Sequence, residues 1–268
     1  MRSRYVPSPL IRASIALHLG AGAALLARPR TWPLALGALV ADHLLLSAAG
    51  LWPQSRLLGP NWTRLPAASA KLGHVAITID DGPDPEVTPQ VLSILRQYGA
   101  TATFFCVGRR VERCAALALN IARHGHAIEN HGYRHTKAFS LFGPKMIYAE
   151  ISRGQDCIVA ASGDRPRFFR APAGLRNPFL EPVLTKLHLR LASWSRRGFE
   201  TVNRHPDDVL RRLTGALRGG DILLLHDGNA ARSVRGVPVI LEVLPRLLET
   251  LRERNLEPIT LRSALGDP

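Results

Sequence analysis

Thr78-Ile79-Asp80-Asp81-Gly82-Pro83 places two adjacent carboxylates at the end of an apolar run, immediately before a turn. Residues 74–79 alternate apolar and polar side chains as a β-strand does, and Gly82-Pro83 ends the run. Neighbouring residues of an extended chain point to opposite sides, so Asp80 and Asp81 are expected to face different partners, one taking a proton and one binding a metal. The alternative is a solvated turn.

Further strand-like runs follow along the chain, and helical patterns separate most of them. The predicted strands are 74–79, 101–107, 127–129, 167–170, 187–193, 221–226 and 256–260. The predicted helices are 85–98, 114–124, 144–163, 206–219 and 238–255. This alternation indicates an α/β fold with a mainly parallel sheet, and about seven strands predict a deformed (β/α) barrel that is incomplete rather than eightfold.

Polar motifs stand at the carboxyl ends of three further strands, where parallel α/β folds place their chemistry. They are Glu129–His135, Phe169–Gly174 and Leu223–Gly228. His131 and His135 are four residues apart, so one helical turn would let both imidazoles share a cation with Asp81. Histidines at this spacing also occur by chance on surfaces, but the position at a strand end favours a metal site.

His226 and Arg170 each allow two interpretations. His226 ends an apolar strand, and it is either a hydrogen-bonded core histidine or a residue held at the rim of a site. Arg170 either forms an ordinary surface ion pair or fixes a neighbouring carboxylate at the strand mouth. The order of all the motifs along the chain helps to distinguish these alternatives.

Taken together and in this order, the four motifs resemble those of the polysaccharide deacetylase family, a carbohydrate esterase type with the NodB homology domain. The resemblance covers about residues 72–264. The segments that match the family's first, second, third and fifth motifs are Thr78–Pro83, His131–His135, Arg170–Pro172 and Leu223–His226. It implies a deformed barrel lacking one strand, and a metal-dependent hydrolase that removes acyl groups from N-acetylated sugars.

The resemblance also implies roles for individual residues. The catalytic residues would be the base Asp80, its partner Arg170 and the acid His226. The metal ligands would be Asp81, His131 and His135, with zinc as the expected ion and cobalt, nickel or manganese as alternatives. The substrate is expected to contact Pro172, Leu224, Trp194 and Arg197, with Leu224 lining the pocket for the acetyl methyl group.

The chemistry of these residue types agrees with that assignment. A zinc-like ion would polarise the amide carbonyl and activate water, ionised Asp80 would take the proton, and the imidazolium of His226 would protonate the leaving amine. The same attack by water would also serve deformylation or removal of an ester-linked acetyl group. A non-enzymatic alternative is a degenerate member that keeps the pocket only to bind glycans.

Three departures from the family pattern stand out. Gly132 replaces a hydroxyl residue that would help to hold the metal loop, and Ala173 replaces a tyrosine. In the fourth motif Arg197 and Thr201 stand where aspartate and tryptophan are expected, so the charge is reversed. Arg196 and Arg197 near the mouth therefore suggest a substrate phosphate, as in a lipid-linked amino sugar.

Composition narrows the class of partner. The net charge of +14 comes from arginines scattered along the chain, without basic blocks or interleaved aromatics, which argues against nucleic acid. Anionic lipid headgroups or a phosphorylated substrate are the expected acidic partners. The three cysteines lack metal-site spacing, so buried free thiols are expected.

The first sixty residues contain two apolar segments, Ala13–Ala27 and Trp32–Trp52, divided by Arg28-Pro29-Arg30. The second is long enough to span a bilayer and the first is marginal, so a membrane hairpin is predicted. A cleaved signal peptide followed by an anchor is the next alternative, and a soluble helical pair is the last. The polar pair Asp42-His43 inside the apolar span would be costly in lipid, and it would face a partner or a lumen or lie near the interface.

Gly59-Pro60-Asn61 and Leu65-Pro66-Ala67 read as a linker. We therefore expect a membrane-associated hairpin and linker over residues 1–70 and a catalytic domain over residues 71–268. The distribution of arginine on the flanks places both hairpin ends in the cytoplasm of a bacterial-type inner membrane, with a periplasmic catalytic domain as the alternative.

Overall fold

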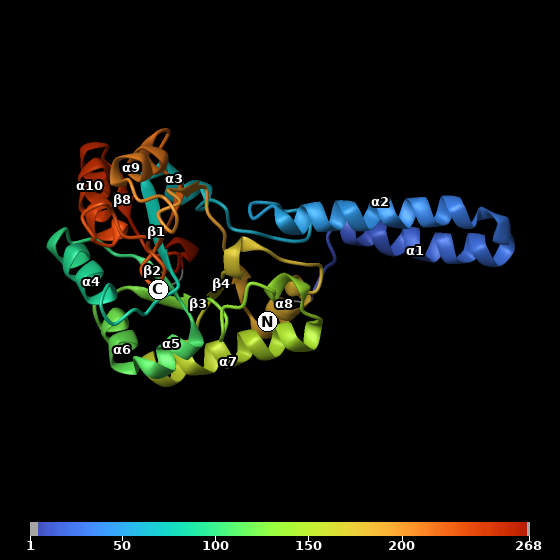
Figure 1. The fold of residues 1–268 in the computed structure, drawn as a ribbon, viewed down its shortest axis with the longest axis horizontal. Helices are drawn as coiled ribbons and strands as arrows, with labels where there is room; N and C mark the ends of the chain where they lie inside the picture. The colour runs from blue at the N-terminus through green and yellow to red at the C-terminus, as the bar shows by residue number, and fades with distance from the viewer. Residues whose placement is uncertain (1–4, 267–268) are drawn as a thin grey trace.

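The computed structural model describes residues 5–266, in which a helical hairpin extends away from an α/β domain (Figure 1). The hairpin consists of α1 (Pro9–Ala27) and α2 (Trp32–Leu51), joined by the 3₁₀ turn η1 (Pro29–Thr31). Ser8 caps α1 by accepting a hydrogen bond from the backbone N–H of Ile11. Both helices are long and apolar enough to cross a membrane, and most of their surface is exposed.

The sheet has the strand order β5-β4-β3-β2-β1-β7-β6, and all neighbouring strands are parallel. Its strands are β1 (His74–Asp80), β2 (Thr103–Cys106), β3 (Ala127–Asn130), β4 (Phe168–Phe169), β5 (Arg190–Leu191), β6 (Arg196–Arg197) and β7 (Ile222–His226). A short β8 (Glu257–Pro258) pairs with the start of β1. The sheet curls into a half-barrel, which confirms the predicted deformed (β/α) barrel. The prediction missed β6.

Helices cover the outer face of this sheet. They are α3 (Ala67–Lys71), α4 (Thr88–Gln97), α5 (Gly108–Arg113), α6 (Ala115–Arg123), α7 (Pro144–Ser162), α8 (Leu180–Leu187), α9 (Pro206–Thr214) and α10 (Val239–Glu253). Three 3₁₀ turns complete the fold: η2 (Phe139–Leu141), η3 (Pro172–Gly174) and η4 (Ser263–Leu265). The five predicted helices are present in shortened form, whereas α3, α5 and α8 were not predicted.

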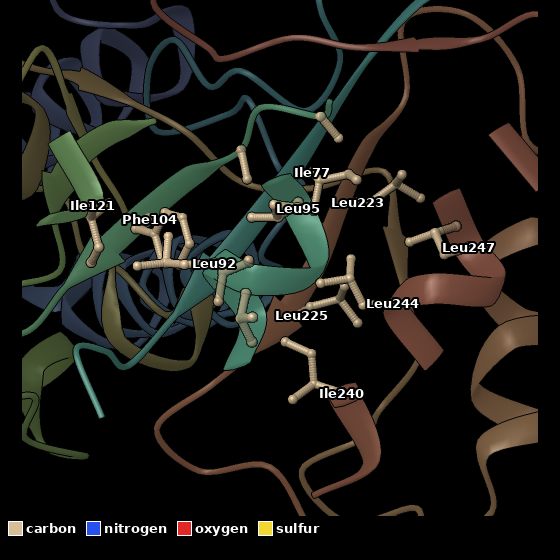
Figure 2. Packing of buried hydrophobic residues seen from close by; sticks show 14 of the residues in the cluster. Ile77, Leu92, Leu95, Phe104, Ile121, Leu223, Leu225, Ile240, Leu244 and Leu247 are labelled. Carbon is tan, nitrogen blue, oxygen red and sulfur yellow. The ribbon is translucent and has the colours of Figure 1, made fainter. Parts of the chain in front are cut away.

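Alternation along the central strands decides which side chains reach the barrel interior. Figure 2 shows Ile77 of β1 and Leu223 of β7 on the outer face, beside Leu95 of α4 and Leu244 of α10. Each such buried side chain contributes roughly 1.5–3 kcal/mol through removal from water. Because successive strand residues alternate sides, residues between them in sequence face inward, which places the last residues of β1 and β7 in the barrel mouth.

The segment between the hairpin and β1 is bonded to the barrel rather than extended as a free linker. The backbone N–H of Arg176 donates to Gly50 O (3.1 Å), which fixes the end of α2. Further along, Trp62 pairs with β5 through Leu191 O (2.9 Å), and Arg64 forms an ion pair with buried Asp221 (2.7 Å). The root of the hairpin is therefore part of the barrel wall.

Candidate active site

The ends of β1 and β7 bring Asp80 and His226 together. The two residues are register partners in neighbouring parallel strands, so their side chains leave the same face at the same level. Both are almost completely buried. The interpretation of Asp80-Asp81 as a solvated turn is therefore wrong.

Asp81, His131 and His135 form a compact group of potential metal ligands, with one ligand atom from each lying within 4.8 Å of the others. Asp81 Oδ1 is 3.3 Å from His131 Nε2 and 3.0 Å from His135 Nε2. The expected helical turn is absent: the histidines lie on a loop after β3, and His135 adopts a left-handed conformation (φ 55°) that turns its ring toward His131.

The prediction that Asp80 and Asp81 point to opposite sides is wrong. Asp81 lies beyond the end of the strand with φ 74°, so the alternation of the extended chain does not apply to it. Both carboxylates approach the same imidazole, since Asp80 Oδ2 is 3.8 Å from His131 Nε2.

The donor set of this group fits a divalent cation. His131 Nδ1 lies 2.8 Å from Arg170 O; a carbonyl only accepts, so the ring proton is on Nδ1 and Nε2 keeps its lone pair. Burial and the neighbouring His131 lower the pKa of His135 to about 4, which keeps its ring neutral. Burial alone would raise the pKa of Asp81, but the two imidazoles lower it below its usual range. Asp81 Oδ1 is buried and accepts no hydrogen bond from the described residues.

Arg170 is the buried partner of Asp80. Its Nη1 donates to Asp80 Oδ1 (2.6 Å) and to Thr78 Oγ1 (2.8 Å), and its Nε and Nη2 donate to backbone carbonyls. Only 1% of Arg170 is exposed, so the interpretation as a surface ion pair is wrong. Burial lowers the pKa of Arg170, although Asp80 opposes this shift. Removing either partner would leave a buried unpaired charge, which typically costs about 3–5 kcal/mol.

Glu200 is a site residue that sequence analysis did not assign. Its Oε1 accepts from His226 Nδ1 (2.6 Å), and the glutamate is completely buried. Burial alone would lower the pKa of His226, but the hydrogen bond and charge of Glu200 raise it. The fourth-motif stretch therefore contributes a buried acidic residue as well as Arg197. The available signal was that Glu200 is the one acidic residue in the stretch 194–205.

Three polar side chains hold the loop that carries His131 and His135 and the neighbouring carboxylate of Asp81. Asn130 Oδ1 accepts the N–H of Gly132 (2.7 Å), and Gly132 has φ 79°, which favours glycine. Buried Glu150 accepts the backbone N–H and the Nε of Arg134. Asn229 Nδ2 donates to Asp81 Oδ2 (2.7 Å), which leaves Oδ1 free for a cation.

The residues expected to contact the substrate differ in exposure. Pro172, Leu224 and Trp194 are buried, and Leu224 and Trp194 belong to the apolar cluster inside the barrel. The guanidinium of Arg197 stacks over the rings of Trp194 and Phe199. Its Nε is buried without a hydrogen-bond partner within residues 5–266.

Arg196 does not face a substrate. Its Nε donates to Asp221 Oδ2 (3.0 Å), and the hydroxyl of Ser195 donates to the other oxygen of the same carboxylate (2.6 Å). Since Asp221 is completely buried and also binds Arg64, Arg196 belongs to a structural ion network. The prediction that Arg196 meets a phosphate is wrong.

A separate arginine-lined cavity opens beside the metal ligands. It has a volume of about 210 Å³ and contacts Asp81, His135 and the arginines at positions 109, 110, 113 and 134. Arg110 and Arg134 are engaged by Asp84 and Glu150. The side chains of Arg109 and Arg113 are exposed and form no side-chain hydrogen bond or ion pair with the residues that the structure describes. Positive potential therefore gathers on this side of the mouth.

Comparison with known proteins fits this geometry. The family model for polysaccharide deacetylase matches residues 68–192. A peptidoglycan-N-acetylglucosamine deacetylase of Bacillus cereus is 36% identical over 182 residues, covering 65% of this chain and 81% of the relative. The chain belongs to the polysaccharide deacetylase family. A chitooligosaccharide deacetylase of Azorhizobium caulinodans is also 36% identical, and the matched region covers 58% of this chain and 73% of the relative.

Solved structures of the deacetylase family share the fold. A family 4 carbohydrate esterase from Streptomyces lividans in complex with acetate is 30% identical, with a TM-score of 0.64 over 72% of this chain and 95% of the other. A pseudoenzyme of the same family from Bacillus anthracis has a TM-score of 0.68 at 21% identity, over 76% of this chain and 68% of the other. The fold alone thus does not separate active from inactive members. The deacetylases of the family are metal-dependent hydrolases of carbon–nitrogen bonds other than peptide bonds, and the similarity to them assigns the chain to that class.

Proposed function

We propose that this protein is a membrane-anchored deacetylase that removes the N-acetyl group from an amino sugar of a glycan. The observation that carries the proposal is the register pair Asp80 and His226 beside the cluster of Asp81, His131 and His135. The names of the relatives, which refer to peptidoglycan N-acetylglucosamine and to chitooligosaccharides, support this class of substrate. A degenerate glycan-binding protein would not need both proton-handling residues.

Asp81, His131 and His135 are the residues that would hold a divalent metal, and zinc suits two imidazoles and one carboxylate. When bound, such an ion polarises the amide carbonyl and lowers the pKa of water. Asn229 orients the carboxylate of Asp81, and the carbonyl of Arg170 orients the ring of His131. These second contacts fix which atom of each ligand faces the cation.

Asp80 is the proposed general base. Arg170 occupies its Oδ1, which leaves Oδ2 on the side of His131 to take a proton from water. His226 is the proposed general acid. Because Glu200 holds Nδ1, the free Nε2 of His226 is the nitrogen that can donate to the leaving amine. Glu200 is a positioning residue, since it acts through His226.

For substrate contacts we keep Pro172, Leu224, Trp194 and Arg197 as proposed residues, with Leu224 and Trp194 forming the apolar floor. We propose that Arg109 and Arg113, rather than Arg196, bind an acidic group of the substrate. An acidic group close to the acylated nitrogen, such as a carboxylate or phosphate, would complement them. The test compares Arg113→Ala with wild type on charged and neutral N-acetylated sugars. If the ratio of kcat/KM for the charged sugar to that for the neutral sugar is the same in both proteins, Arg113 does not select for negative charge.

The hairpin is the proposed membrane anchor. Helices of 19 and 20 residues are about 28 and 30 Å long, close to the thickness of the hydrocarbon core. Arg28 and Arg30 at its tip would lie at the far interface, so both ends would lie on one side of the membrane. We infer that residues 1–70 anchor the domain formed by residues 71–268. Labelling of a cysteine introduced at exposed Arg123 in intact cells would show which side carries the domain.

The activity is tested on the full-length protein purified in detergent. N-acetylated chitooligosaccharides and peptidoglycan fragments are the substrates, and release of acetate and of free amine is measured before and after chelation. Parallel assays with N-formyl and O-acetyl sugars separate deacetylation from the two related hydrolyses. Protein that retains stoichiometric metal but releases no acyl group would favour the glycan-binding alternative.

A further inference from the structure

A large cavity lies at the root of the hairpin, away from the residues of the proposed active site. Its volume is about 680 Å³, and it is lined mostly by apolar side chains. The hairpin contributes Ile11, Ile15 and Leu46, and the catalytic domain contributes Leu141 and Phe179. Pockets of this size and lining hold small ligands in other proteins.

Arg176 is the one charged side chain in the lining of this cavity. Only 4% of it is exposed, and its Nη2 donates to Ser55 O (2.6 Å). Its Nε is buried without a hydrogen-bond partner, and no carboxylate in the described range 5–266 forms an ion pair with it. Glu181 acts on it only through space. A buried guanidinium without an anion is costly, so the site is incomplete as a purely protein structure.

The charge on Arg176 persists at neutral pH. Burial lowers the pKa of Arg176 to about 10, which still leaves the guanidinium protonated. Burial also raises the pKa of Glu181, and no hydrogen bond joins that carboxylate to Arg176 within residues 5–266. An acceptor carrying full negative charge would satisfy the Arg176 Nε and its charge together.

The position of the cavity indicates what kind of anion fits. Two exposed apolar helices form one wall, and their surface continues outward from the cavity as the hairpin (Figure 1). Gly50 lies so close to Arg176 that a Cβ would be 2.2 Å from Arg176 O, so the backbone of Arg176 packs directly against the end of α2. A charged head at Arg176 and a hydrocarbon tail along the hairpin would match this arrangement of polar and apolar surface.

We propose that the cavity at the hairpin root binds an anionic membrane phospholipid, with its phosphate on Arg176 and an acyl chain against α1 and α2. Free phosphate would satisfy the guanidinium but would leave the apolar wall without a partner. An uncharged diacylglycerol would cover the wall but leave Arg176 unpaired. Binding of the lipid therefore requires both parts of the same molecule.

The test uses the full-length protein in a neutral detergent and short-chain phosphatidylglycerol as the probe. Dioctanoylglycerol and inorganic phosphate are the two partial ligands. At saturation, the phospholipid is expected to raise the unfolding midpoint by about 5 °C or more, and each partial ligand by much less. An equal shift with inorganic phosphate would reduce the site to an anion site and overturn the lipid assignment.

Variants separate the two halves of the site. Arg176→Met is expected to weaken phosphatidylglycerol binding at least tenfold, whereas Arg123→Met, which removes the same charge from an exposed position on α6, should not. Because Arg176→Met could itself unfold the protein, Ser47→Trp provides a second route. Ser47 is exposed on α2 and lines the cavity, so the indole should fill the space of the acyl chain without touching Arg176. If Ser47→Trp binds the phospholipid as tightly as wild type, the proposal is wrong.

Discussion

Asp80 and His226 are register partners at the ends of β1 and β7, and each is held by its own buried partner of opposite charge. The first prediction follows from this pairing. Asp80→Asn is expected to lower turnover about 10²–10⁴-fold, because the general base is lost while the shape of the side chain remains. Metal analysis of the same protein should show a bound ion, since Asp81 and the histidines are untouched.

His131→Ala serves as the matched comparison, and it should lose both metal and turnover. Normal activity in Asp80→Asn would show that Asp80 is not the general base.

Glu200→Gln is predicted to shift the alkaline limb of the pH–rate profile. Glu200 raises the pKa of His226, so the charged imidazolium persists to higher pH in the wild type. The amide oxygen of glutamine can still accept from Nδ1, but without the negative charge the pKa of His226 should fall. We expect the limb to move toward acid. A pH profile of kcat/KM measures this, and an unmoved limb would mean that His226 is not the titrating acid.

Asn229→Ala is predicted to weaken metal binding about 10–100-fold, because Asp81 Oδ2 loses the amide that orients it. Competition with a chromogenic chelator gives the affinity. Asn120→Ala is the control, since Asn120 is exposed on α6 and its side chain forms no hydrogen bond in the described part of the chain. Equal affinities in the two variants would argue against a role for Asn229.

His126 is predicted to make the fold sensitive to acid. Its Nδ1 accepts the N–H of Ala102 (3.2 Å), and burial, with a smaller effect of His124, lowers its pKa to about 4. The folded state therefore favours the neutral ring, so stability is complete above about pH 6.5 and is lost as the pH falls toward 4. The loss should reach about 2 kcal/mol at pH 5.

Urea unfolding at several pH values tests this prediction. In His126→Asn, whose amide oxygen can replace Nδ1, the decline below pH 6.5 should be smaller than in wild type. His124→Asn, the exposed neighbour, should keep most of the wild-type decline, because His124 makes only the smaller contribution to the lowered pKa of His126. The prediction fails if all three proteins lose stability in parallel.

Gly50→Ala is predicted to disturb the junction between hairpin and barrel. The new methyl group would lie 2.2 Å from Arg176 O, so the backbone must move, at a cost of about 1–3 kcal/mol. Thermal unfolding and limited proteolysis of residues 52–66 would show the change. Gly37→Ala on the same helix meets nothing within 4 Å and should leave both readouts unchanged.

The strands and the site residues at their ends could be predicted because both depend on local sequence. Apolar runs such as Ile222–Leu225 define a buried strand, and the polar residue that follows must lie at its mouth. The family motifs then supplied the order. The short strand β6 escaped prediction because Arg196 and Arg197 have no apolar pattern and are held there by pairing with β7.

Glu200 could not be assigned for a related reason. Arg197 pairs with Leu224, and Phe199 then takes a left-handed turn (φ 64°), which brings Glu200 level with His226. Neither the register nor that turn is visible in the sequence. Likewise, alternation predicted opposite directions for Asp80 and Asp81, whereas the backbone leaves the strand between them.

Hydrogen bonds between the segment after α2 and the residues that follow β5 determine how proteolysis of that segment affects the enzyme. Ser193 donates to Pro53 O (2.8 Å), and Gln54 donates to Trp194 O (2.9 Å), while Ser193 O in turn holds the guanidinium of Arg170. Proteolysis of the segment after α2 is therefore expected to weaken the contact between Arg170 and Asp80, as well as to separate the hairpin from the domain. Cleavage there would then lower activity, and a fragment starting at residue 71 would be a poor substitute for the whole chain.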